Sequence, residues 1–107
     1  MSAYRYKITV EALTRATGEP GEGQILSFEA ANHDDILGVV DRLRARLPFD
    51  ENTVASLGVG LNLFSEVTLR ERNDPMFAMI QPALGEFIRG LKQRSSAQSP
   101  VSLGRLL

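Results

Sequence analysis

The sequence contains no cysteine among its 107 residues. This absence excludes disulfides, thiolate nucleophiles and cysteine-ligated metals. An excess of charge is also missing, because 12 Lys and Arg residues stand against 13 Asp and Glu residues. A protein that binds the phosphate backbone of nucleic acids needs a basic face, so we expect no nucleic-acid partner.

Long hydrophobic runs are absent as well. No apolar stretch approaches the roughly 18 residues of a transmembrane helix, and the N-terminus MSAYRYKITV has no hydrophobic region of signal-peptide length. We therefore expect a cytoplasmic protein that does not bind a membrane. Hydrophobic residues make up 43% of the chain and charged residues 23%, which is typical of a globular domain. The length suits a single domain.

The N-terminal third of the chain predicts a β-hairpin. Residues 4–12, YRYKITVEA, alternate apolar and polar side chains, which is typical of an antiparallel strand with one wet face. Residues 24–31, QILSFEAA, form the second predicted strand, and the glycine-rich segment between the strands is typical of a turn or loop. A two-stranded sheet is only marginally stable alone, so we expect helices to cover its apolar face.

Three helices are predicted after the hairpin. Residues 33–47 carry one apolar stripe, with Asn32 as the expected N-cap. Residues 53–72 are apolar on nearly every side of a helical wheel and are expected to form the central core helix. Residues 75–94 begin with the cap Asp74 and carry a stripe that runs through Pro82, so this helix is expected to be bent or split there.

One alternative stays open within the central helix. Residues 59–69 also alternate in a strand-like way, and Gly58 and Gly60 each cost a helix about 1 kcal/mol relative to alanine. The predicted fold is therefore α+β, with a hairpin on three helices, or ββαβα with residues 59–69 as a third strand. Residues 1–94 would form one domain. Residues 95–107 would form a tail that is either flexible or docked on a partner subunit.

A first candidate for chemistry is His33, which stands beside Asp34 and Asp35. A histidine next to carboxylates can bind a metal or act as a general base. No second histidine exists to complete a common metal site. Capping of the following helix is the favoured interpretation, and we expect no metal and no cofactor.

The second candidate is the pair Asn62 and Glu66, one turn apart on the central helix. Buried polar groups need partners, so this pair could line a small pocket or meet a charged neighbour such as Lys7. The favoured interpretation is that the pair marks the wet side of the helix. Together with His33 and Tyr6, these residues are the candidate ligand-binding residues, and no catalytic residue is identified.

Four stretches of the chain resemble a known family. They are YRYKITV, LSFEAANHDDI, LGVGLNLFSEVTLRER and PMFAMIQPALGEFIRGLK. They resemble small bacterial proteins grouped as a domain of unknown function, family 3861 of that series. The resemblance covers about residues 4–93 and implies one α+β domain, with no catalytic residue to carry over.

Two function classes remain. The favoured hypothesis is a non-catalytic interaction domain that forms a homodimer, because no catalytic motif is found and a two-stranded sheet leaves edges that must be blunted or paired. The alternative is a small-ligand-binding protein or small enzyme with a pocket between the sheet and the helices.

Overall fold

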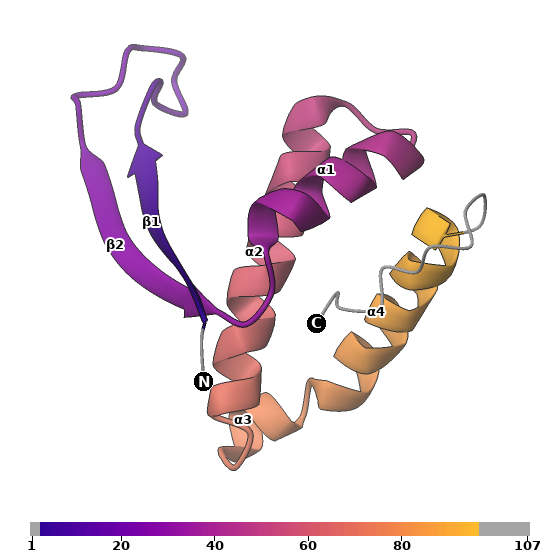
Figure 1. The fold of residues 1–107 in the computed structure, drawn as a ribbon. Coiled ribbons are helices and arrows are strands. Elements are labelled where there is room, and N and C mark those ends of the chain that lie inside the picture. Colours follow the sequence, from indigo (N-terminus) through magenta and orange to yellow (C-terminus); the bar gives the residue numbers. More distant parts are fainter. Residues whose placement is uncertain (1–2, 97–107) are drawn as a thin grey trace.

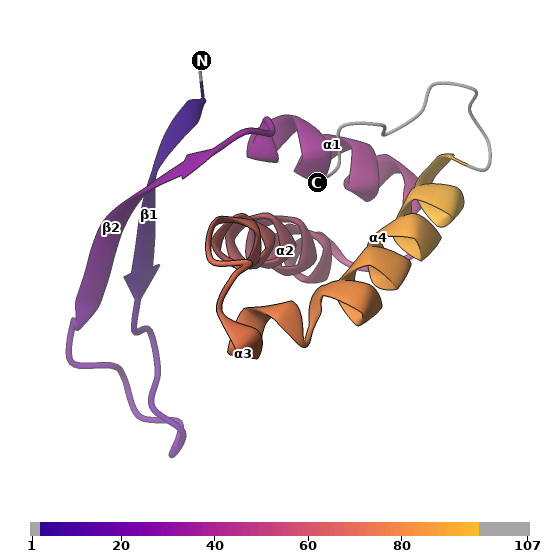
Figure 2. The same cartoon turned by 90° about the horizontal axis from the view of Figure 1, so that it is seen from below.

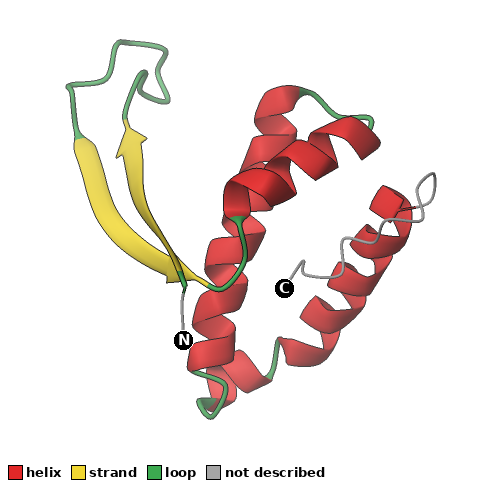
Figure 3. Ribbon diagram, in the orientation of Figure 1, coloured by secondary structure: helices red, strands yellow, loops and turns green. Residues whose placement is uncertain are grey.

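The computed structural model describes residues 3–96 of the chain. This part forms a hairpin followed by helices, and the predicted α+β fold is confirmed (Figures 1 and 3). In chain order the elements are β1 (Tyr4–Glu11), β2 (Ile25–Asn32), α1 (Ile36–Arg46), α2 (Glu51–Arg70), α3 (Pro75–Ala78) and α4 (Gln81–Ser96). The predicted tail lies outside the described residues from residue 97 onward, so the choice between a flexible and a docked tail is not tested.

The two strands pair in the antiparallel register that their alternation predicts. Tyr4 lies opposite Asn32 at the base of the hairpin, and Val10 lies opposite Leu26 toward its tip. The polar side chains share the other face, where Thr9 and Ser27 are hydrogen-bonded across the strands at 3.0 Å. The pairing therefore places every apolar side chain of β1 on one face of the hairpin.

Aspartates begin three of the helices. Asp35 caps α1 by accepting a hydrogen bond from the backbone N–H of Gly38 at 3.2 Å. Asp50 caps α2 by accepting from the hydroxyl and the backbone N–H of Thr53, and these bonds lower the pKa of the Asp50 carboxyl. Asp74 caps α3, as predicted. The predicted N-cap Asn32 is wrong, because Asn32 is the last residue of β2 and α1 begins only at Ile36.

The central stretch is a helix, and the strand alternative for residues 59–69 is wrong. α2 runs for 20 residues without a break, far longer than an ordinary strand. Its Gly58 is required by packing, because a Cβ at this position would lie 2.7 Å from Cγ2 of Val40 in α1. The glycine therefore lets α1 and α2 approach closely, which offsets its low helix propensity. A Cβ at Gly60 would meet nothing within 4 Å.

The third predicted helix is split, as expected. The break falls at Met79 and Ile80, so Pro82 lies in the first turn of α4 rather than in a helix interior. A proline in the first turn removes no helical hydrogen bond. α4 then adds its apolar side to a core formed with α1 and α2, whose buried members are Val39, Leu43, Leu47, Val54, Leu61 and Leu91.

The hairpin stands on one side of α2 and α4 lies on the other (Figure 2). The helices cover only the base of the hairpin, so the expectation of a fully covered apolar face is wrong for its distal half. Val10 and Leu26 remain 57% and 60% exposed. α2 is not covered on all sides either, since Phe64 is 46% exposed. The physical reason is that β2 reaches α2 only through its last residues.

Candidate functional site

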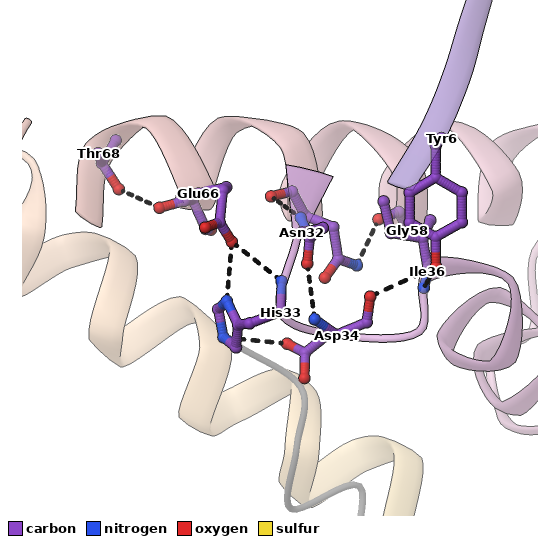
Figure 4. A network of polar contacts seen from close by, with 10 residues as sticks. Tyr6, Asn32, His33, Asp34, Ile36, Gly58, Glu66 and Thr68 are labelled. Carbon is purple, nitrogen blue, oxygen red and sulfur yellow. Dashed lines mark hydrogen bonds and ion pairs between the residues drawn. The ribbon is translucent and has the colours of Figure 1, made fainter. Parts of the chain in front are cut away.

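The connection between β2 and α1 lies directly against α2 and holds a network of polar contacts (Figure 4). Asn32 is completely buried at its centre. The Asn32 side chain donates a hydrogen bond to the backbone carbonyl of Asn62 at 3.0 Å and accepts one from the backbone N–H of Asp34 at 2.9 Å. One amide therefore fixes the turn after β2 and fastens that turn to α2.

His33 and Glu66 form the second contact between the turn and α2. Nδ1 of His33 lies 2.7 Å from Oε1 of Glu66, and the backbone N–H of His33 donates to the same oxygen at 3.4 Å. Nε2 of His33 lies 3.5 Å from Oδ2 of Asp34. The histidine ring is thus held between a carboxylate of α2 and a buried carboxylate of its own turn, while its side chain stays 45% exposed.

Tyr6 connects β1 to the same turn. Its hydroxyl accepts a hydrogen bond from the backbone N–H of Ile36 at 2.9 Å and donates one to the carbonyl of Asp34 at 3.4 Å. Burial raises the pKa of Tyr6 above its ordinary value, and the bond from Ile36 opposes only part of that rise. The hydroxyl satisfies the first amide of α1, which has no partner within its own helix.

The favoured interpretation of Asn62 and Glu66 as a wet strip is wrong. Asn62 is completely buried, and its side-chain amide donates to the carbonyl of Gly58 at 2.7 Å. The turn after β2 covers this side of α2, so the polar side chains face a partner segment and not water. Within residues 3–96, two buried atoms have no hydrogen-bond partner, Oδ1 of Asn62 and Oγ of Ser65.

The structure brings all four candidate residues to one place, but they do not share one cavity. His33 borders a hollow of about 160 Å³ with Ser65, between α2 and α4. Glu66 borders a separate hollow of about 480 Å³ between β2 and α2. The bonding groups of Tyr6, His33, Asn62 and Glu66 mostly contact one another or the backbone. The arrangement is therefore a clasp that fastens the hairpin to α2.

A metal-binding cluster is not found among the described residues. No group of three or more histidine, aspartate or glutamate side chains in residues 3–96 is placed to bind a metal ion. Among the helices of this part of the chain, none combines the length and hydrophobicity that crossing a membrane requires.

A second surface, formed by apolar side chains, is not among the candidate sites predicted from the sequence. We call it the hairpin face; its members are Tyr4, Ile8, Val10, Leu26 and Phe28, all on the same side of the sheet as Tyr6. Four of these five are large side chains with 41% to 60% of their surface exposed. Alternation in the sequence reveals that such a face exists. It gives no sign that the face stays uncovered.

Comparison with known proteins decides the family. Residues 4–93 match the family described as "Domain of Unknown Function with solved-structure structure (DUF3861)". The chain belongs to this family. A DUF3861 match agrees with the resemblance in the sequence and leaves the activity open, because the description names none.

A solved structure supports the same assignment. The chain is similar to a crystal structure of a protein of unknown function (eca1910) from Pectobacterium atrosepticum, with a TM-score of 0.75 and 27% identity. The similarity covers 86% of this chain and 99% of the other. No curated protein matches the chain.

Proposed function

We propose that this DUF3861 chain is a small non-catalytic interaction domain that forms a homodimer through its hairpin face. The observation that carries the proposal is the exposure of the distal part of that face, where Val10 and Leu26 are 57% and 60% exposed. Apolar side chains that gather in one exposed patch mark an interaction surface, whereas single exposed ones do not.

The low stability of an isolated hairpin supports a partner on the hairpin face. An isolated two-stranded hairpin is marginally stable in water and needs further strands or a packed helix. The clasp supplies that support at the base, through Asn32, His33 and Tyr6, but it does not reach Val10 and Leu26. Burying such a side chain fully is worth about 1.5–3 kcal/mol, so a partner on the hairpin face would stabilise the distal half considerably.

The charge distribution agrees with self-pairing. The hairpin face carries no charged side chain, and on the opposite face Arg5 already forms an ion pair with Glu29. Two identical hairpin faces can therefore meet about a twofold axis, as in most homodimers, without placing like charges against each other.

The alternative of a small-ligand-binding protein or enzyme has less support. It needs polar groups that converge on an open cavity, and most polar groups of the clasp bond to one another or to the backbone. A cytoplasmic location stays a prediction from the composition.

The test is the oligomeric state of two matched double variants. Val10→Lys/Leu26→Lys places charges on the hairpin face, and Thr9→Lys/Ser27→Lys places the same charges on adjacent paired positions of the opposite face. Sedimentation equilibrium should find a dimer for the wild type and the control, and a monomer for the first variant. Circular dichroism at 222 nm should show that all three keep their helices.

Two outcomes would overturn the proposal. One is a wild-type chain that stays monomeric at the highest concentration reached. The other is a control pair that dissociates as fully as the pair on the hairpin face, since dissociation would then report hairpin damage and not loss of an apolar contact.

A further inference from the structure

An apolar groove lies between the turn that joins α1 to α2 and the second half of α4. We call it the helix groove; its apolar members are Leu47, Phe49, Leu57, Phe87 and Leu91. Its volume is about 520 Å³, within the range of about 300–1,000 Å³ found for ligand pockets. Because α4 and the hairpin lie on opposite sides of α2 (Figure 2), this groove is separate from the hairpin face.

The groove combines a fixed floor with open walls. Leu47 and Leu91 are only 6% exposed and belong to the core, while Phe49 and Phe87 are 45% and 50% exposed. The guanidinium of Arg94 lies 5.6 Å from the centre of the Phe49 ring and thereby connects the last turns of α4 to the α1–α2 turn. A rigid apolar floor with uncovered aromatic walls is suited to binding apolar side chains.

The C-terminal segment of the chain has a sequence suited to the helix groove. Residues 101–107, VSLGRLL, follow the described part of the chain after residues 97–100, AQSP. Leu103, Leu106 and Leu107 stand at positions i, i+3 and i+4, which share one face of a helical turn. Apolar grooves bind helical segments through anchors at this spacing.

The connection has the right length for this segment to reach its own groove. Leu91 lies five positions before Ser96, the last residue of α4, and therefore about 7.5 Å back along the helix at 1.5 Å per residue. The six residues 97–102 span on average about 12–15 Å as a flexible chain. Such a short tether gives an effective concentration of the order of millimolar, so even weak docking would be populated.

We propose that the segment 101–107 docks in the helix groove of its own chain through Leu103, Leu106 and Leu107. The family match ends at residue 93, so the proposed docking segment lies outside the part of the chain that matches DUF3861. It does not depend on the proposed dimer, because the groove and the hairpin face use different residues.

The absence of cysteine allows a direct test in the full-length chain. A nitroxide label at Arg105→Cys will broaden the NMR signals of nearby amides. We expect broadening at Phe49 and Leu57, which face α4 across the groove, and none at Gly18 in the hairpin loop. Leu103→Ser/Leu106→Ser should remove it, whereas the matched polar variant Gln98→Ala/Ser99→Ala should leave it unchanged.

A mixing experiment distinguishes docking within one chain from docking between two copies. One set of chains carries the nitroxide but no isotope, and the other carries 15N but no nitroxide. In their mixture the amide signals of Phe49 and Leu57 should stay sharp. The proposal is overturned if these two signals are broadened only in the mixture, if they are never broadened, or if the broadening survives the two leucine substitutions.

Discussion

Substituting Asn32 by alanine tests whether the clasp holds the hairpin to the helices. The change removes a completely buried side chain together with its bonds to the carbonyl of Asn62 and the N–H of Asp34. A buried group left without a partner costs about 1–3 kcal/mol. Asn32→Ala removes one bond from each of two such groups, the N–H of Asp34 and the carbonyl of Asn62. The loss at Asn62 costs less, because its carbonyl lies within a helix. We therefore expect a loss of about 2–4 kcal/mol from a typical total of 5–15 kcal/mol.

Urea unfolding followed at 222 nm measures this loss. With a dependence of about 2 kcal/mol per molar urea, the midpoint should fall by about 1–2 M. Asn52→Ala is the matched control, because Asn52 is exposed in the first turn of α2 and surface substitutions stay within about 0.5 kcal/mol. Equal midpoints for Asn32→Ala and Asn52→Ala would refute the claim that the clasp stabilises the fold.

Two further predictions use the same unfolding assay. Gly60→Ala should stabilise α2 by about 1 kcal/mol. Gly58→Ala should be less stable than Gly60→Ala by about 1–3 kcal/mol, because the added Cβ would overlap Val40. Equal stabilities of the two variants would contradict the close packing of α1 and α2. Burial raises the pKa of Tyr6 in the folded chain. The neutral hydroxyl therefore contributes its full stabilisation of the fold below about pH 10, and this stabilisation is lost as the pH rises through the pKa of the folded state. The difference in unfolding free energy between wild type and Tyr6→Phe should shrink as the pH rises above about 10, and a constant difference would contradict the burial of the hydroxyl.

Local patterns in the sequence predicted the elements well, because each pattern reports a local cause. Alternation placed both strands within one residue of their observed bounds, and the sequence NDP placed the start of α3. The long apolar stretch became a helix, since a run of 20 residues exceeds the length of ordinary strands.

The partners of the polar residues could not be predicted, because they depend on tertiary contacts. Asn32 and Asp35 are both good N-caps by type. Only the nearby carbonyl of Asn62 explains why Asn32 turns to α2 and leaves the cap to Asp35. Likewise, a helical wheel places Asn62 and Glu66 on one side of α2 but does not reveal that the turn carrying His33 covers that side.

The hairpin illustrates a different limit. The sequence predicts which side chains lie on its apolar face, and the expectation that helices cover this face fails most clearly toward the tip. The clasp acts at the base, next to Asn32, and β2 carries Leu26 away from α2. In our account, the cover for that part comes from another copy of the chain, and no pattern within one chain can report such a contact.

The most direct test of this account is an isotope-filtered nuclear Overhauser experiment on a mixture of labelled and unlabelled chains, which detects only contacts between copies. The account predicts contacts between the copies at Val10, Leu26 and Phe28 of the hairpin face. Contacts confined to helical residues such as Phe87, or no contact between copies at all, would contradict it.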